Sequence, residues 1–304
     1  MENNQPLLSI CIPTYNRKEK VLRQISRIIP QLSNYDTTTV EVLVSDNCSK
    51  DGTSIAIKEQ YAKDKLTLYT QNNNLGLVGN LYFLFEKAQG EYIWFLSDDD
   101  LVEDDAVSNI LEALSCSSKD FYLLNFKLDT SPGSLYWQYD SDYLSLFNSK
   151  TWGGFGLLSA QVLRKQAFRE FYYSTKADFN LCQPVAVSLY GLFYLKGEVL
   201  FDKAHLKHHV GDYSWAPRAL EVSSVYLYYS IRLLKRYGEG RKYREILNQA
   251  VSTNIMAGAS IRYILKSRDF RYMRDLKNDR ILFSIIATGV HFYIKKKLNI
   301  CLAK

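Results

Sequence analysis

The chain has 304 residues, of which 47% are hydrophobic and 23% are charged, with six prolines and fifteen glycines. This composition excludes a disordered tail, and the length suffices for one large domain with a smaller packed appendage. The net charge of +6 is unevenly spread: residues 203–304 hold 20 Lys and Arg against 7 Asp and Glu, which leaves 18 against 25 for residues 1–202. We expect the basic C-terminal part to meet an anionic partner or to present a solvated basic face.

The cysteines and the N-terminal segment indicate a cellular compartment. Five scattered cysteines without a Cys-x-x-Cys pair are typical of free thiols in a reducing environment. The first residues lack a basic stretch followed by an apolar one, so no secretory signal is expected. The longest late uncharged run, residues 281–294, is too short to span a bilayer. We therefore expect a cytoplasmic protein.

Short apolar runs alternate with stretches of helical periodicity over the first hundred residues. Strands are predicted at residues 7–12, 40–45, 66–70, 92–96 and 121–126. Apolar residues at helical spacing lie between the first two strands, before the fourth and after it. This βαβ pattern predicts an α/β fold with a mostly parallel sheet flanked by helices. From residue 219 onward the pattern turns helical, with one stripe from Tyr243 to Leu265, and predicts a small C-terminal helical region.

Polar sequences follow four of the predicted strands. They read PTYNR at residues 13–17, DNCSKDGT at 46–53, NNNLG at 72–76 with Gly79 and Asn80, and SDDD at 97–100. Ligands of open α/β sheets bind beyond the carboxyl ends of the strands, so we expect the four sequences to converge on one site. The ring of Tyr15 could stack on a base. Asp46 could accept hydrogen bonds from a base or ribose, or equally cap a turn or helix.

The three aspartates at residues 98–100 carry the strongest chemical signal. Successive carboxylates after a buried strand repel one another unless a cation neutralises them. A hard divalent ion, Mn²⁺ or Mg²⁺, is the natural partner, held by one or two carboxylates and by substrate phosphates. The alternative is an acidic cap ahead of a helix from about Asp104.

Together these residues resemble the family 2 glycosyltransferases of GT-A fold, many of which build bacterial surface polysaccharides. The matching segments are SICIPTYNR at residues 9–17, EVLVSDNCS at 41–49, NLG at 74–76 and AQGEYIWFLSDDD at 88–100. The resemblance covers about the first 110 residues in the right order. It implies a GT-A domain over residues 1–215, with a nucleotide-sugar-binding half (1–126) and an acceptor-binding half (127–215), followed by a basic helical region (216–304).

The resemblance also implies an inverting glycosyltransferase that moves a sugar from a nucleotide-diphosphate sugar, such as a UDP-sugar, to a hydroxyl of a glycan or lipid-linked acceptor. Many members read Phe-Leu-Asp-x-Asp-Asp, which aligns Ser97 with the first carboxylate and Asp99 with the metal-binding second one. Asp98 or Asp100 could support the metal or bind the ribose, and we assign Asp100 to the metal. The residues assigned to the donor are Pro13, Thr14, Tyr15, Asn16, Arg17, Asp46, Asn47, Gly76, Asn80 and Asp98.

Two further roles follow from the resemblance. The family often places its catalytic base in a Glu-Asp-x-Asp-Leu-like segment some 80 residues after the metal motif, where this chain has ADFNL at residues 177–181. Asp178 is therefore the expected base, and Glu170, Asp202 and Asp212 are the alternative bases. A purely structural alternative is that Asp178 caps a helix. A late histidine often contacts the metal or diphosphate, which favours one of His208 and His209, since neighbours on a strand point to opposite faces.

Residues 280–297 combine an apolar stretch with three terminal lysines, as in a helix that lies in an anionic membrane interface. Packing of this helix on the main domain is the alternative.

A non-catalytic scaffold of the same fold would have lost some of its site carboxylates, whereas the three aspartates are intact. A nucleotidyltransferase would need a glycine-rich loop after the first strand, where PTYNR has no glycine. No nucleic-acid partner is expected, because no known basic-aromatic motif is present.

Overall fold

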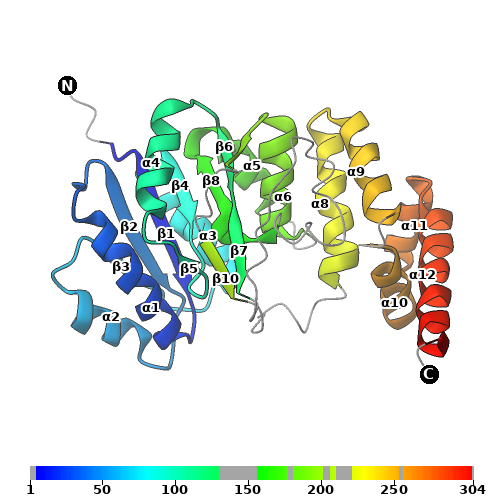
Figure 1. Cartoon of the computed structure of the whole chain (residues 1–304), viewed down its shortest axis with the longest axis horizontal. Coiled ribbons are helices and arrows are strands. Elements are labelled where there is room, and N and C mark those ends of the chain that lie inside the picture. The colour runs from blue at the N-terminus through cyan, green and yellow to red at the C-terminus, as the bar shows by residue number, and fades with distance from the viewer. Residues whose placement is uncertain are drawn as a thin grey trace. The chain divides into compact units, whose positions relative to one another are not determined.

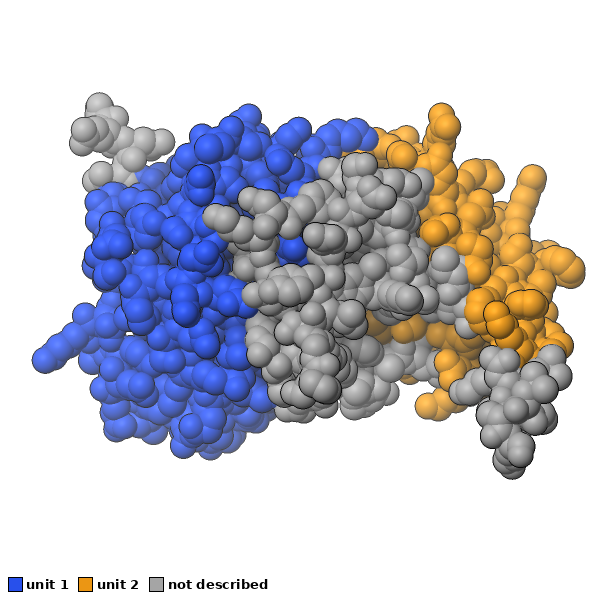
Figure 2. Space-filling view, viewed as in Figure 1, with its two compact units in different colours: residues 1–138, 157–178, 195–212 blue, residues 139–156, 179–194, 213–304 orange. Residues whose placement is uncertain are grey.

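The computed structural model describes residues 5–129, 156–176, 181–200, 206–209, 221–252 and 256–302 (Figure 1). The chain forms two compact units (Figure 2). Unit 1 comprises residues 1–138, 157–178 and 195–212, and unit 2 comprises residues 139–156, 179–194 and 213–304. A domain boundary at residue 215 stays a prediction.

Unit 1 is built on a seven-stranded sheet of order β3-β2-β1-β4-β8-β6-β9. β1 pairs in parallel with β2 and β4, and β2 pairs in parallel with β3. β8 is antiparallel to both of its neighbours. The predicted mostly parallel α/β architecture is therefore confirmed. The strands are β1 Leu8–Thr14, β2 Val40–Asp46, β3 Thr67–Thr70, β4 Tyr92–Phe95, β6 Phe121–Leu124, β8 Gln161–Arg164 and β9 Glu198–Leu200.

A second, three-stranded sheet has the order β5-β10-β7 and uses β5 Leu101–Val102, β7 Phe126–Asp129 and β10 Leu206–His209. The strand predicted at residues 121–126 is in fact two strands, β6 and β7, which belong to different sheets. Asn125 lies between them, and its backbone N–H donates to the carbonyl of Leu200 (3.2 Å). The apolar run gives no sign of this change of sheet, because residues on both sides favour extended structure.

Helices flank the sheet of unit 1 (Figure 1). The apolar faces predicted before and after β4 are buried on α3 and α4, as expected from their periodicity. Strand β1 is buried along its whole length, Ser9 and Thr14 included, which explains why its sequence is mainly apolar instead of alternating. The helices are α1 Lys18–Ile28, α2 Thr53–Tyr61, α3 Gly76–Lys87, α4 Ala106–Cys116 and α5 Lys165–Thr175.

Unit 2 is helical over its described residues, as predicted for the C-terminal region. Its helices are α6 Gln183–Leu189, α8 Leu227–Arg236, α9 Gly240–Ser252, α10 Ala257–Ser267, α11 Phe270–Asn278 and α12 Leu282–Leu302. The stripe predicted from Tyr243 to Leu265 is divided between α9 and α10, and Leu265 is 75% exposed. Among the described residues, no helix combines the length and apolar character needed to cross a bilayer.

A buried carboxylate ties α8 to the end of α11. The Asp279 side chain is only 6% exposed and forms an ion pair with Lys235. The hydroxyl of Tyr228 donates a hydrogen bond of 2.5 Å to the same carboxylate. Burial acts to raise the pKa of Asp279, but hydrogen bonds from Lys235 and Tyr228 outweigh it and lower the pKa overall. The ionised form is therefore the one that stabilises unit 2.

We predict that Asp279→Asn lowers the free energy of unfolding by about 2 kcal/mol at neutral pH, because Lys235 loses its buried partner. Since the folded-state pKa is lowered, this stabilisation is present above the unfolded pKa of about 4 and is lost as pH falls through the folded value. Urea denaturation of both proteins at several pH values measures the difference.

Glu245→Gln provides the control, because Glu245 pairs with Arg241 and Lys242 on the surface of α9 and its loss should change stability little. Equal unfolding midpoints for Asp279→Asn and the wild type at neutral pH would contradict the role assigned to the buried carboxylate.

Candidate active site

The carboxyl ends of three parallel strands meet at one edge of the large sheet. Thr14, the last residue of β1, pairs in register with Asp46, the last residue of β2. On its other side β1 pairs with β4, and the aspartates at residues 98–100 follow β4 directly. The first, second and fourth polar sequences are thus brought to the same edge.

Arg17 and Thr14 join the end of β1 to the aspartates after β4. The guanidinium of Arg17 lies 2.7 Å from Asp98 Oδ1 and 2.8 Å from Asp99 Oδ2, both through Nη1. The hydroxyl of Thr14 donates to Asp98 Oδ2 at 2.8 Å. A protein cation therefore neutralises part of the charge that the three successive carboxylates create.

This pairing changes the acidity of both partners. Asp98 is only 3% exposed, and burial raises its pKa, although Arg17 and Thr14 act in the opposite direction. Burial alone would lower the pKa of Arg17, but Asp98 and Asp99 outweigh it and raise the pKa overall. The guanidinium consequently stays charged beside the carboxylates at every relevant pH.

Asp99 and Asp100 are held by serines. Asp99 accepts a hydrogen bond of 2.5 Å from the hydroxyl of Ser97, and its side chain is 26% exposed. Asp100 is buried and accepts a hydrogen bond of 2.5 Å from the hydroxyl of Ser159. Ser159 precedes β8 and also accepts from the backbone N–H of Ser97 (2.9 Å). The sequence does not single out Ser159, because it is far from the motif in the chain and belongs to no recognisable pattern.

The aspartates do not cap the following helix. Strand β5 lies between them and α4, which begins only at Ala106, with Asp105 at its N-cap position. The alternative of an acidic cap ahead of that helix therefore does not account for residues 98–100.

The turn after β1 is linked to the loop after β2 and is partly open to solvent. Asn16, at a φ of 52°, donates its backbone N–H to the hydroxyl of Ser49 (2.8 Å) and accepts from the N–H of Lys50 (2.7 Å). The ring of Tyr15 is 42% exposed, whereas Pro13 is buried within β1.

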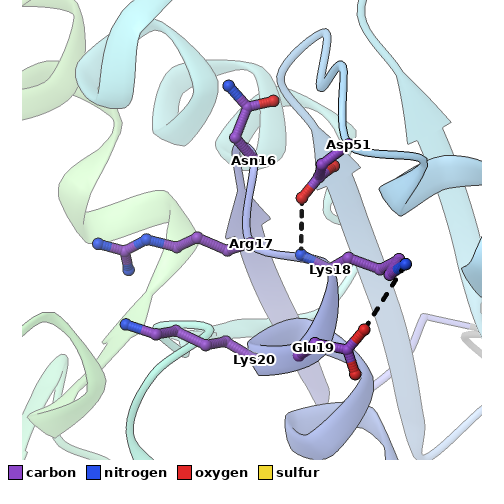
Figure 3. Close-up of a pocket in the computed structure, with 6 residues that line it drawn as sticks. All are labelled: Asn16, Arg17, Lys18, Glu19, Lys20 and Asp51. Carbon is purple, nitrogen blue, oxygen red and sulfur yellow. Dashed lines mark hydrogen bonds and ion pairs between the residues drawn. The ribbon is translucent and has the colours of Figure 1, made fainter.

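A pocket lies beside this turn, lined by residues 16–20 and Asp51 (Figure 3). Asp51 accepts a hydrogen bond from the backbone N–H of Lys18 (3.0 Å). The side chains of Arg17 and Lys20 extend in the same direction, away from Asp51 (Figure 3). The turn thus directs two cationic side chains to one side, where Arg17 also forms its ion pairs with Asp98 and Asp99.

Asp46 and Asn47, both assigned to the donor, make internal hydrogen bonds. Asp46 accepts from the N–H of Ser49 (3.1 Å) and from the hydroxyl of Ser54, which fixes the turn after β2. Asn47 donates to the carbonyl of Gly76 (3.1 Å) and to Asn74, which links the second and third polar sequences.

Asn80 is buried and clamps α3 onto β2, because it accepts from the hydroxyl of Ser45 (2.6 Å) and donates to the carbonyl of the same residue (3.0 Å). Gly76 begins α3 at a φ of 70°, a conformation that favours glycine. These residues shape the edge of the sheet, and their contact with a donor stays a prediction.

His208 and His209 lie on β10, next to the segment that follows the aspartates. β10 pairs antiparallel with β5, with Leu206 opposite Val102 and Lys207 opposite Leu101. Since Leu101 directly follows Asp100, the backbone of β10 runs from Leu206 toward the aspartates. The topology therefore brings the predicted histidine strand to the predicted metal-binding segment.

Asp178, the predicted base, lies outside the described residues, as do Asp202 and Asp212. The remaining alternative, Glu170, is exposed on α5. The assignment of the base to Asp178 therefore stays a prediction.

The oxygen ligands of this site fit a divalent metal ion. Among the described residues, however, no group of three or more His, Cys, Asp or Glu side chains could hold a metal by itself. The partly exposed Asp99 offers the hard oxygen ligand that Mn²⁺ and Mg²⁺ prefer. Such ions are commonly held by one or two carboxylates together with substrate phosphates. The residues thus fit a metal that binds with the donor.

Comparisons with known proteins identify relatives of this chain. Residues 9–175 match the model of glycosyl transferase family 2. The chain is 33% identical over 127 residues to abequosyltransferase RfbV of Salmonella typhimurium, covering 40% of this chain and 36% of that protein. It is also 33% identical over 109 residues to a GalNAc(5)-diNAcBac-PP-undecaprenol β-1,3-glucosyltransferase of Campylobacter jejuni, covering 35% and 34%. The matched regions span only about a third of these relatives.

Solved structures share the fold. S. aureus TarS 1-349 in complex with UDP-GlcNAc matches with a TM-score of 0.63 at 19% identity, over 81% of this chain and 72% of that one. Mannosyltransferase PcManGT from Pyrobaculum calidifontis, in complex with GDP-Man and Mn²⁺, matches with a TM-score of 0.56 at 13% identity, over 94% and 87%. These similarities confirm the expected GT-A fold. With the family model matching more than half of its length, the chain belongs to glycosyltransferase family 2.

Proposed function

We propose that this protein transfers a sugar from a nucleotide-diphosphate sugar, of the UDP-sugar class, to a hydroxyl of a glycan or lipid-linked acceptor in surface polysaccharide biosynthesis. The observation that carries the proposal is the joining of the turn after β1 to the aspartates after β4 through Arg17. Family membership and the UDP-GlcNAc and GDP-Man complexes of proteins with this fold support it. The protein acts in the cytoplasm, where nucleotide sugars are available.

Donor binding uses the exposed side of the first turn. The ring of Tyr15 is accessible for stacking on the base. Arg17 and Lys20 extend to one side of the pocket and attract the diphosphate (Figure 3). Asp98 fixes the guanidinium of Arg17, so that this cation is already oriented before the donor arrives.

Asp99 is the first ligand that we assign to Mn²⁺ or Mg²⁺, with Asp100 and one of His208 and His209 in support. When bound, the ion stabilises negative charge on the departing nucleoside diphosphate. Ser97 and Ser159 orient the two carboxylates through hydrogen bonds of 2.5 Å. Such support fixes ligand positions before the ion binds.

We assign proton removal from the acceptor hydroxyl to Asp178. A carboxylate on the face of the sugar opposite the leaving diphosphate gives inversion at the anomeric carbon, because the activated hydroxyl then attacks in line. The new glycosidic bond forms as the bond to the diphosphate oxygen breaks, and the proton passes to Asp178.

We predict that UDP and Mn²⁺ bind with mutual dependence and that Asp99→Asn weakens UDP binding in Mn²⁺ at least about tenfold, because the carboxylate that links ion and protein is lost. Isothermal titration calorimetry with and without Mn²⁺ measures both effects. The matched control is Asp104→Asn, which removes a carboxylate shortly after β5 that is 96% exposed. Metal-independent UDP affinity, unchanged in Asp99→Asn, would rule out the bridge.

The two histidines on β10 should differ in effect, because adjacent residues of a strand face opposite ways. We predict that one of His208→Ala and His209→Ala weakens Mn²⁺-dependent UDP binding about tenfold, while the other leaves it unchanged. The same titration measures both variants, each serving as control for the other. Wild-type binding in both would remove histidine from the site.

We predict that Asp178→Asn preserves donor binding and lowers kcat by about 10³-fold, the range expected for loss of a general base. Donor affinity and turnover are measured on the same preparation, with an acceptor identified by screening glycans and lipid-linked sugars. Glu170→Gln is the comparison, since this exposed carboxylate is the alternative base within the described residues. Normal turnover in Asp178→Asn, with loss in Glu170→Gln, would transfer the role to Glu170.

A further inference from the structure

Helix α12 carries an apolar stripe on its exposed side. Phe283 is 81% exposed, Ile286 and Val290 are each 47% exposed, and Ile294 is 51% exposed. At 100° per residue these four side chains lie within about 80° of one another on the helix. We call them the α12 stripe.

The α12 stripe is separate from the face by which α12 packs in unit 2. Ile285 is fully buried, and a Cβ at Gly289 would collide with the side chain of Ile261 on α10. Gly289 therefore allows close packing of α12 on α10, which it lies beside (Figure 1). The α12 stripe lies on a different side of the helix from these packing residues, so about half or more of the surface of each stripe side chain stays exposed.

The helices α10 to α12 are basic. Residues 256–302 contain ten Lys and Arg against three Asp and no Glu. Eight of the ten belong to described, exposed positions: Arg262, Lys266, Arg268, Arg271, Arg274, Lys277, Arg280 and Lys295.

The three aspartates of this segment are engaged within the protein. Asp269 caps α11 by accepting from the N–H of Tyr272 (2.9 Å). Asp275 is 8% exposed and pairs with Arg232 (2.9 Å), while Asp279 pairs with Lys235. The accessible charge of the helices α10 to α12 is consequently almost purely positive.

We propose that the α12 stripe and the surrounding lysines and arginines bind the surface of an anionic lipid bilayer, with α12 lying in the interface plane. Exposed apolar side chains enter the region between headgroups and acyl chains, while lysines and arginines contact lipid phosphates. Each component alone binds weakly, and the two together in helices α10 to α12 give stable attachment.

Charge distinguishes this partner from a second copy of the chain. Two copies meeting through the α12 stripe would bring together two groups of helices with an excess of exposed cations, while Asp275 and Asp279 are paired inside each copy. A nucleic acid would satisfy the cations but offers no apolar phase for Phe283 and its neighbours. An anionic bilayer supplies both.

The test uses the full chain and flotation with vesicles of phosphatidylcholine alone or with about one third phosphatidylglycerol. We expect binding to the anionic vesicles that weakens as salt rises, and little binding to neutral ones. Phe283→Ser should weaken anionic-vesicle binding about fivefold or more, because the most exposed apolar side chain of the stripe is lost. Lys266→Gln with Arg271→Gln should weaken it to a similar extent.

The matched control is Ile55→Ser, which removes a side chain that is 64% exposed on α2 of unit 1 and should leave vesicle binding unchanged. Equal binding to both kinds of vesicle, no binding to either, or an unaffected Phe283→Ser variant would overturn the proposal. So would light scattering that shows a wild-type dimer and a Phe283→Ser monomer, or displacement from vesicles by an oligonucleotide whose own binding is insensitive to Phe283→Ser. Because the readout is lipid binding, its outcome is independent of sugar transfer.

Discussion

The ion pair between Arg17 and Asp98 is the interaction on which the edge of the sheet depends. An almost fully buried carboxylate is costly unless a cation and hydrogen bonds compensate its lost hydration, and Arg17 and Thr14 provide both. Because these partners come from the end of β1 and the carboxylate follows β4, the pair fixes two loops that are far apart in sequence. The remaining polar sequences are attached to this frame through Asn16, Asp46 and Asn47.

The ion pair between Arg17 and Asp98 also affects how an ion and a donor could bind. Arg17 already neutralises much of the charge of Asp98 and Asp99, so the aspartates do not require a metal ion for the chain to fold. A divalent ion and a diphosphate arriving together bring opposite charges that largely cancel, which makes joint binding at Asp99 less costly than binding of either alone. The metal ion that we propose should therefore bind more tightly when the nucleotide is present.

Much of the fold follows from patterns in the sequence, and the exceptions have physical reasons. Strands β1, β2 and β4 are largely buried and read as mainly apolar runs that lead into polar sequences, so their positions and their convergence are predictable. Residues 121–129 are divided between two sheets because β6 pairs with β9 while β7 pairs with β10, and no local pattern encodes pairing with these distant strands. The interruption between α9 and α10 is hidden for a similar reason, because the apolar spacing continues across it.

The site is predictable in part. Its aspartates and the PTYNR turn stand out by chemistry and position, yet the pairing of Arg17 with the aspartates instead of with solvent requires knowledge of which strands are neighbours. The role of Ser159 could not be predicted from the sequence, because it donates its hydrogen bond to Asp100 from a segment about sixty residues away. The α12 stripe illustrates the opposite case: its apolar spacing is visible in the sequence, but only the packing of Gly289 on Ile261 reveals which face stays exposed.

We propose above that the acidic cluster after β4 holds a divalent ion against the diphosphate of an activated sugar. Anomalous diffraction from a crystal grown with Mn²⁺ and a UDP-sugar locates such an ion without ambiguity. A manganese peak between the diphosphate and Asp99, with Arg17 on the phosphate side, is the result this account predicts. A bound donor with the aspartates at residues 98–100 turned away and no peak between them would contradict it.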